Sequence, residues 1–309
     1  MPKETKNKKI NQERLLPLYL STKDSNKRAK KQEGVEDEKP PFETTTLWDY
    51  PKQSYGKKPK GDNKFQGVTP AFIIWNMLQR YTNSGDLVVD PMAGSGTTID
   101  VCEEEGRRVI GYDINPQHPK VIKNDSRKIP LEDNSVDMVF IDSPYGDNVN
   151  YSDDPRDIGK ISAEDSKFYE ELEKVAREIY RILKPGKVVG WLIGDQWVRR
   201  KFTPVGFKIY ETLIDKVGFE PIDIICVARR NQSSNTPIWH YRAKKFNFFL
   251  RGFKYLIIAK NLQMKEYIKK FRKLDGSVIN NRYKNFMPFL RRVKSFFLLP
   301  KKELNWWVL

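Results

Sequence analysis

The stretch LVVDPMAGSGTT (Leu87–Thr98) decides the fold of this 309-residue chain. Its first four residues form a short apolar run that ends in Asp90, a pattern typical of a buried strand. The letters GSG follow, and glycine lets a backbone turn tightly and approach a ligand closely. A second apolar run, VDMVFID (Val136–Asp142), leads into the tetrapeptide DSPY (Asp142–Tyr145). Together these strings predict two neighbouring strands that end at one ligand site.

Strand-like and helix-like segments alternate along the middle of the chain. The predicted strands are Leu87–Asp90, Arg108–Asp113, Lys120–Asp125, Val136–Asp142, Lys187–Gly194, Ile222–Ala228 and Lys254–Lys260. The predicted helices are Thr69–Thr82, a segment ending at Gly106, Ala163–Lys184 and Val205–Val217. Short apolar strands that alternate with helices indicate an α/β fold with a mostly parallel, doubly wound sheet.

The excess positive charge lies at the two ends of the chain. The net charge is +16, with ten Lys or Arg against three Asp or Glu in residues 1–32, and twelve against three in residues 262–309. The part between them, residues 33–261, is neutral. Such basic ends are either solvated tails or arms that bind a polyanion by releasing its counterions.

Composition also excludes several classes of protein. No apolar run approaches the roughly 18 residues of a membrane span, and the N-terminus lacks an apolar signal segment. Two cysteines, Cys102 and Cys226, in a chain of this length indicate a reducing compartment, so we expect a cytoplasmic protein. The two histidines, His118 and His240, lie far apart and lack cysteine partners, so we predict no metal site.

Three predicted strands end in acidic residues, namely Asp90, Asp113 and Asp125. In a doubly wound sheet, ligands bind beyond the carboxyl ends of the strands. The glycine turn is neither a dinucleotide fingerprint nor a P-loop, and Asp90 beside it would repel a phosphate. A cationic cofactor is therefore favoured, with Asp113 placed for a ribose diol and Asp125 for an adenine edge.

These motifs resemble those of DNA amino-methyltransferases. DPMAGSGTT is similar to their S-adenosylmethionine-binding motif, DPFxGSGTT, and DSPY to their catalytic DPPY or SPPY tetrapeptide. Two flanking segments, Gly106–Pro116 and Thr69–Asp86, resemble the second strand and the preceding cofactor-binding helix of that family. The resemblance spans Thr44–Asn261. It implies a Rossmann-like class I methyltransferase fold, with a final antiparallel strand and S-adenosyl-L-methionine as cofactor.

The resemblance also implies roles for individual residues. The cofactor-binding set is Asp90, Met92, Ala93, Gly94, Gly96, Thr97, Asp113 and Asp125, and the catalytic set is Asp142, Ser143, Pro144 and Tyr145. An exocyclic base amine is a poor nucleophile because its lone pair is delocalised into the ring. Acceptors for both N–H bonds, here the Asp142 carboxylate and the Ser143 carbonyl, favour a tetrahedral nitrogen. Pro144 restricts the preceding residue, and Tyr145 would stack on a flipped base.

Two positions depart from the family pattern. Ser143 stands where the tetrapeptide usually has its first proline, which loosens the turn, and Met92 replaces a frequent aromatic residue. In this family a leading Asp is typical of N6-adenine enzymes and a leading Ser of N4-cytosine enzymes. DSPY mixes the two forms, and adenine is weakly favoured.

The segment Ala228–Lys254, between the last two predicted strands, contains both basic and aromatic residues. Its predicted DNA contacts are Arg229, Arg230, Arg242, Lys244 and Lys245. Its aromatic residues either stack on bases or fill a core under a hairpin. The polar loop Gly146–Ser162, after DSPY, is a candidate lid over the target base.

We therefore expect three parts: a basic, mostly disordered arm over residues 1–43, a catalytic domain over 44–261, and a basic aromatic extension over 262–309. The predicted function is methyl transfer to an amino group of a DNA base. An RNA guanine-N2 methyltransferase and an inactive nucleic-acid-binding subunit stay as alternatives. Because no insertion of a hundred residues or more is available as a large target-recognition domain, we expect sequence specificity to be short, to come from these small segments, or to be supplied by a partner such as a restriction nuclease or specificity subunit.

Overall fold

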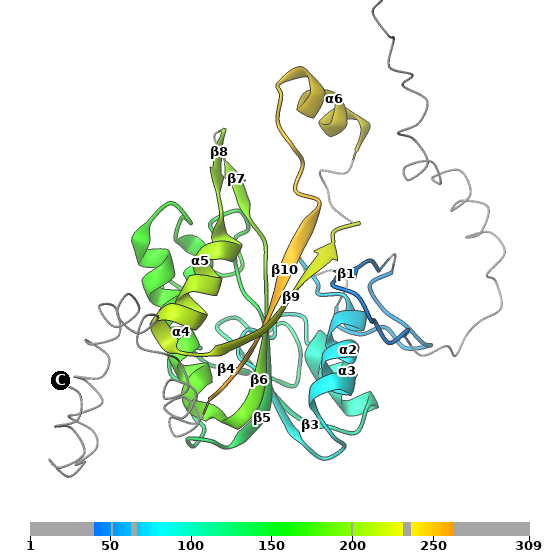
Figure 1. Cartoon of the computed structure of the whole chain (residues 1–309), viewed down its shortest axis with the longest axis vertical. Helices are drawn as coiled ribbons and strands as arrows, with labels where there is room; N and C mark the ends of the chain where they lie inside the picture. The colour runs from blue at the N-terminus through cyan, green and yellow to red at the C-terminus, as the bar shows by residue number, and fades with distance from the viewer. Residues whose placement is uncertain (1–39, 51, 63–66, 199, 231–235, 263–309) are drawn as a thin grey trace, which may run out of the picture.

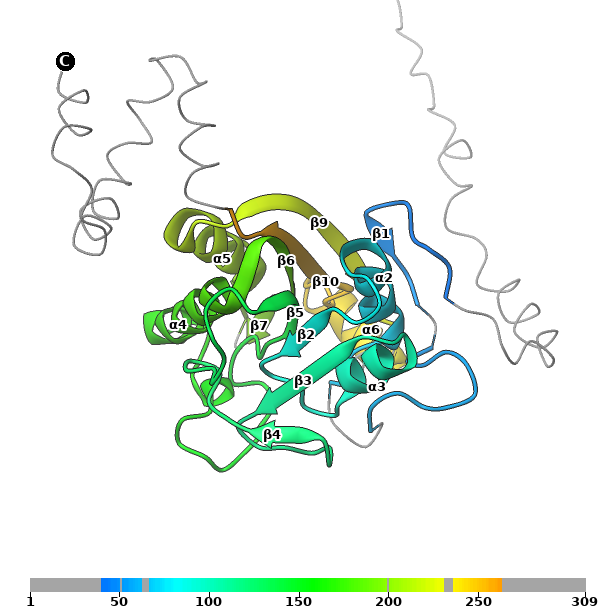
Figure 2. The same cartoon turned by 90° about the horizontal axis from the view of Figure 1, so that it is seen from below.

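A central sheet, covered by helices on both faces, organises the protein. The computed structural model describes residues 40–50, 52–62, 67–198, 200–230 and 236–262. Eight strands form the sheet in the order β1-β9-β10-β6-β5-β2-β3-β4. Figures 1 and 2 show the helices divided between its two faces. Almost all of the predicted N-terminal arm and C-terminal extension lies outside the described residues.

Five neighbouring strands are parallel, as the alternating pattern predicted. They are β2 (Leu87–Asp90), β3 (Arg108–Asp113), β4 (Val121–Lys123), β5 (Val136–Asp142) and β6 (Leu183–Ile193). Six of the seven residues of β5 are buried, since helices cover both faces of the sheet. Strand β6 begins earlier than predicted and includes the KPG that was expected only to stop the preceding helix.

Two pairs of helical segments flank this parallel part. One face carries α2 (Ala71–Tyr81) and α3 (Thr97–Glu104), and the other carries α4 (Ser166–Ile182) and α5 (Val205–Glu211). The π-helix η3 (Thr212–Val217) continues α5. Helix α4 is shorter than predicted because the Asp165 carboxylate caps its N-terminus by accepting from Lys167 N.

The last strands make the sheet mixed. β10 (Phe253–Lys260) lies between β6 and β9 (Glu220–Ala228) and is antiparallel to both. The short β1 (Leu47–Trp48) pairs in parallel with the outer side of β9. The predicted final antiparallel strand is thus confirmed. Because β10 runs in the opposite direction, its first residues lie at the edge where the parallel strands end.

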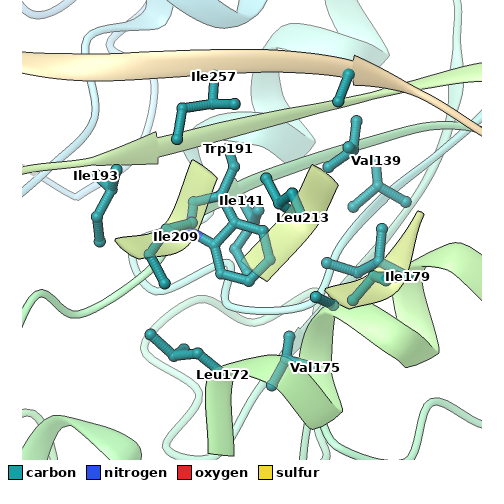
Figure 3. Packing of buried hydrophobic residues seen from close by; sticks show 14 of the residues in the cluster. Val139, Ile141, Leu172, Val175, Ile179, Trp191, Ile193, Ile209, Leu213 and Ile257 are labelled. Carbon is teal, nitrogen blue, oxygen red and sulfur yellow. The ribbon is translucent and has the colours of Figure 1, made fainter. Parts of the chain in front are cut away.

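The core under α4 contains apolar residues that recur at helical spacing on one face of that helix. Leu172, Val175 and Ile179 recur on one face and pack toward Trp191 of β6 and Ile141 of β5 (Figure 3). All five side chains are fully buried. This packing fixes β5 and β6 side by side and thereby fixes the position of the DSPY motif at the end of β5.

Smaller elements project beyond the carboxyl edge of the sheet. They are the 3-10 helix η2 (Ile158–Lys160), the hairpin of β7 (Gln196–Val198) and β8 (Lys201–Thr203), and helix α6 (Pro237–Lys245). Figure 1 shows the hairpin and α6 at the same end of the molecule. Helix α6 buries none of its side chains, so its aromatic residues do not fill a core.

Searching the described ranges for a long apolar helix finds none that could cross a bilayer. The same ranges hold no cluster of three or more His, Cys, Asp or Glu arranged to bind a metal ion.

Replacing Ile179 with Ala tests the packing of α4. The side chain is fully buried, so its loss should lower the free energy of unfolding by about 2–5 kcal/mol, measured by urea denaturation. The matched control is Ile222→Ala on β9, where the side chain is 41% exposed and the change should be within about 0.5 kcal/mol. Equal losses in the two variants would contradict this packing.

Candidate active site

A pocket lies at the carboxyl edge of the sheet, where β2, β3 and β5 end. Its lining brings together every predicted cofactor and catalytic residue except Gly96. These are Asp90, Met92, Ala93, Gly94, Thr97, Asp113, Asp125, Asp142, Ser143, Pro144 and Tyr145. They come from segments up to 55 positions apart in the sequence, and the parallel sheet unites them. Their individual roles stay predictions.

The glycine turn needs its glycines for conformational reasons. Gly94 and Gly96 have φ of 44° and 82°, in the left-handed region that other residues rarely adopt. A Cβ on Gly96 would also lie 2.4 Å from the ring of His118. Gly96 caps the start of α3, outside the pocket lining, and there it lets the turn pass closely under the loop that follows β3.

Asp90 is buried at the end of β2. Its carboxylate accepts hydrogen bonds from Thr98 Oγ1 at 2.5 Å and from Met92 N at 3.0 Å. Burial, with a smaller contribution from the nearby Asp113 and Asp142, raises the pKa of Asp90 to about 7, although those two hydrogen bonds act to lower it. A cation entering the pocket would favour the ionised form.

Asp113 and Asp125 are also engaged by their surroundings. Asp113 accepts from the backbone N–H groups of Gly94 and Asn115, both at 2.9 Å, and burial raises its pKa. Burial also acts to raise the pKa of Asp125, but Arg127, whose Nη2 lies 2.6 Å away, outweighs it and holds that pKa below the usual value. Both carboxylates line the pocket and keep lone pairs for further donors.

The carboxylate of Asp142 is held by two residues that sequence reasoning did not select. Lys254 Nζ donates to both of its oxygens, at 2.7 and 2.9 Å, and Thr69 Oγ1 donates to Oδ2 at 2.8 Å. The side chains of the ion pair are only 15% and 11% exposed. The signal for Lys254 was its place at the start of an antiparallel strand, which brings it to the edge where β5 ends.

Ser143 gains an anchor that a proline at this position could not provide. Its hydroxyl accepts a hydrogen bond of 2.9 Å from the indole N–H of Trp191, and the residue is 2% exposed. The bond ties the tetrapeptide to the core through a fully buried side chain. It offsets the loosening expected from the missing proline ring.

Tyr145 lies at the rim of the pocket beside two cations. Arg229 donates to its hydroxyl at 3.3 Å, and the charged groups of Arg229 and Lys254 each lie 5.7 Å from the ring centre. The ring therefore sits in an electropositive setting next to the Asp142 carboxylate.

The loop predicted as a lid is tied down at several points. Asn115 donates to the backbone oxygen of Tyr151 at 2.8 Å, and Ser152 donates to Asp157 at 2.8 Å. The side-chain amide of Gln196 donates to Asp147 and Asn148 at the start of the loop. Closure of this loop over a substrate stays a prediction.

The predicted DNA-contact residues divide into two groups. Arg229 lies at the pocket, and Arg230 forms an ion pair with Asp49. Arg242, Lys244 and Lys245 lie on the projecting α6, where Arg242 covers the ring of Trp239 at 5.0 Å. The fold does not test whether these side chains contact DNA, so these contacts stay predictions.

Comparison with known proteins agrees with this geometry. The sequence matches the N6/N4 DNA methylase family over residues 3–124 and 136–289. The chain belongs to this family. The type II methyltransferase M.MjaII of Methanocaldococcus jannaschii is 30% identical over 118 residues, which is 37% of this chain and 22% of that relative. The DNA adenine methyltransferase YhdJ of Escherichia coli is 33% identical over 75 residues, 24% of this chain and 25% of that relative.

The matched segments therefore span about a quarter of the length of these curated DNA methylase relatives. Among solved structures, a SAM-dependent methyltransferase from Archaeoglobus fulgidus gives a TM-score of 0.39 at 21% identity. That alignment covers 64% of this chain and 96% of the other.

The residues of the pocket suit a sulfonium cofactor. The buried Asp90 lacks a cationic side chain among the hydrogen-bond partners described above, and Gly94 of the adjacent turn lines the same pocket. The pocket is lined by Asp90, Asp113 and Asp125, which suits a ligand with a cationic group at one end and a ribose and adenine at the other.

The raised pKa of Asp90 predicts how cofactor affinity depends on pH. S-adenosylmethionine should bind about tenfold more tightly at pH 8 than at pH 6, because Asp90 ionises with a pKa of about 7 and only the carboxylate attracts a cation. Titration calorimetry measures this. Asp90→Asn should bind weakly at both pH values, leaving only the titration of the ligand itself, and an unchanged pH dependence in that variant would contradict the assignment.

The raised pKa of Asp90 also makes the free energy of unfolding depend on pH, but here a higher pH is unfavourable. Because folding favours the protonated form of Asp90, the wild type should lose unfolding free energy relative to Asp90→Asn as pH rises from about 4 to about 7.

Proposed function

We propose that this protein transfers the methyl group of S-adenosyl-L-methionine to the exocyclic amine of a DNA base. N6 of adenine is preferred over N4 of cytosine because the tetrapeptide begins with Asp142. The observation that carries the proposal is the position of the Asp142 carboxylate, in one pocket with the glycine turn after β2. Membership of the DNA methylase family supports DNA as the substrate.

When bound, S-adenosyl-L-methionine would supply the methyl group, and the bond between that methyl group and sulfur would break as the amine takes the group and gives up one proton. Asp142 and the backbone carbonyl of Ser143 would accept hydrogen bonds from the two N–H groups of the target amine, which localises its lone pair for attack. Pro144 limits the backbone before it and so fixes the direction of that carbonyl. Tyr145 stacks on the base after the base has rotated out of the duplex. Orientation and electrostatics thus provide the rate enhancement without a covalent intermediate.

Lys254 and Thr69 prepare the Asp142 carboxylate for this role. Lys254 Nζ contacts both oxygens and Thr69 contacts one, so the acceptor is oriented before the base arrives. A carboxylate has about four lone-pair positions, which leaves one for an amine N–H. Arg229, with Arg242, Lys244 and Lys245 on α6, would contact phosphates of the bound strand.

Mass spectrometry of nucleosides tests this proposal. DNA and tRNA are incubated separately with the protein and labelled S-adenosylmethionine, then digested. We expect N6-methyladenine in the DNA sample. N4-methylcytosine would overturn the base preference alone. Label in tRNA only would favour an RNA guanine-N2 enzyme, and no label in either would favour an inactive nucleic-acid-binding subunit.

Replacing Asp142 with Ala should separate chemistry from cofactor binding. Without the carboxylate the amine loses its main acceptor, so transfer should fall by at least about 100-fold. The affinity for S-adenosylmethionine, measured by calorimetry, should change by less than about threefold, because other residues hold the cofactor. Loss of cofactor binding in this variant would contradict the proposed division of roles.

Replacing Lys254 with Met tests its action through Asp142. The turnover number should fall about 10- to 100-fold because the acceptor is no longer held in place, whereas Lys254→Arg should retain more activity. In an Asp142→Asn background the same change should have little further effect, since coupled residues are not additive. An equal loss in both backgrounds would show that Lys254 acts independently of Asp142.

A further inference from the structure

Two segments far apart in the sequence form one stack of flat side chains on the part of the protein that projects beyond the sheet. From the hairpin come Trp197 and Phe202, and from the segment between α6 and β10 come Phe248 and Arg251. The rings of Trp197 and Phe248 are stacked, with centres 6.3 Å apart and planes 15° apart. The guanidinium of Arg251 lies 6.0 Å from the ring centre of Trp197 and 5.2 Å from that of Phe202. Phe248 is among the aromatic residues for which the sequence suggested either base stacking or a core position, and the other three side chains have no role assigned above.

The stack is exposed, although it is composed of large apolar rings. Trp197 is 37% and Phe202 43% exposed. Nearby on the same projecting segment, Tyr241, Phe246 and Phe249 are 60%, 56% and 82% exposed. Phe248 and Arg251 are half-buried. Several large exposed rings on one projecting part of a protein are typical of an interaction site.

The hairpin is anchored to the catalytic motif. Strand β7 begins three residues after β6 ends, and its first residue, Gln196, is 2% exposed. The amide of Gln196 donates to Asp147 at 3.0 Å and to Asn148 at 3.1 Å, just after DSPY. Figure 1 shows the hairpin and α6 rising from the edge of the sheet where β6 ends. The hairpin that carries Trp197 and Phe202 therefore starts at the carboxyl edge of the sheet, the edge at which the pocket lies.

The charges around the stack favour a polyanion as the occupant. Arg200 and Lys201 lie in the hairpin, and Arg242, Lys244 and Lys245 lie on α6. Lysine is depleted in the centre of protein–protein interfaces. Basic side chains combined with exposed aromatic rings are instead typical of surfaces that bind single nucleic-acid strands.

We propose that Trp197, Phe202, Phe248 and Arg251 form a platform on which an unpaired DNA base stacks next to the base that enters the pocket. The inference rests on the proposed DNA substrate. A base inside a duplex is already stacked on both faces, but rotation of the target base exposes the faces of its neighbours and leaves its partner unpaired. Because the four side chains are already stacked before DNA binds, a nucleobase can stack on them at little cost in side-chain conformational entropy.

Base-dependent binding tests the platform. The probes are a mixed-sequence deoxyribo-oligonucleotide and an abasic oligonucleotide of the same length, which has the same phosphates but no bases. The wild type should bind the probe with bases about tenfold more tightly, a typical value for the loss of one stacked base. Trp197→Ala and Phe202→Ala should lose most of this preference, and the part that remains reflects stacking of the target base on Tyr145.

Three controls separate stacking from other effects. Ile222→Ala removes an exposed apolar side chain from β9 and should leave the preference for bases unchanged. Lys245→Gln should reduce the dependence of affinity on salt, whereas Trp197→Ala should not, because stacking releases no counterions. Trp197→Phe keeps a ring and the hairpin fold, so it should retain most of the preference while losing any quenching of tryptophan emission by the probe.

Three outcomes would overturn the platform: equal wild-type affinity for the two probes, an undiminished preference in both alanine variants, or base-dependent binding of a ribo-oligonucleotide but not of the DNA probe. The proposed function has its own readout. If nucleoside analysis finds no methylated DNA base while base-dependent DNA binding persists, the proposed methyl transfer fails and the platform stands as a DNA-binding surface.

Discussion

Parallel strands end at one edge of a sheet, and in this protein that constraint gathers four carboxylates into one pocket. Each is balanced differently. Burial shifts Asp90 toward its neutral form, backbone N–H groups bind Asp113, Arg127 pairs with Asp125, and Lys254 pairs with Asp142. Asp125 and Asp142 thus meet cationic side chains, whereas the hydrogen bonds described for Asp90 and Asp113 come from neutral donors. This arrangement supports the proposal that a ligand with positive charge at one end binds in the pocket.

The site is connected to the core through single, identifiable bonds. Trp191 belongs to the packing under α4 and also donates to the hydroxyl of Ser143, so the same side chain stabilises the fold and holds the DSPY tetrapeptide. Gln196 similarly links the hairpin to the loop after DSPY. We therefore expect changes in the core beneath β5 and β6 to alter the position of Asp142 and Ser143, the proposed amine acceptors.

Sequence patterns predicted the elements that depend on local composition. The apolar runs of β2, β3 and β5 were correct to the residue, because strands buried on both faces require such runs. Helix ends were less accurate, since caps such as Asp165 decide them. Lys254 and the hairpin of β7 and β8 were not identified as part of a site. Neither lies in a motif, and their importance depends on the direction of β10 and on contacts across the fold.

The sequence by itself determined the family, because the glycine turn at a strand end and the string DSPY are local motifs that are recognised without the fold. It also determined the parallel sheet, since alternating apolar runs and helices have few other solutions. Only the tertiary structure decided what holds Asp142 and what stands beside the pocket. Lys254 is 112 positions from Asp142, and Trp197 is 51 from Phe248. Such contacts arise from the order and direction of strands, which no local pattern encodes.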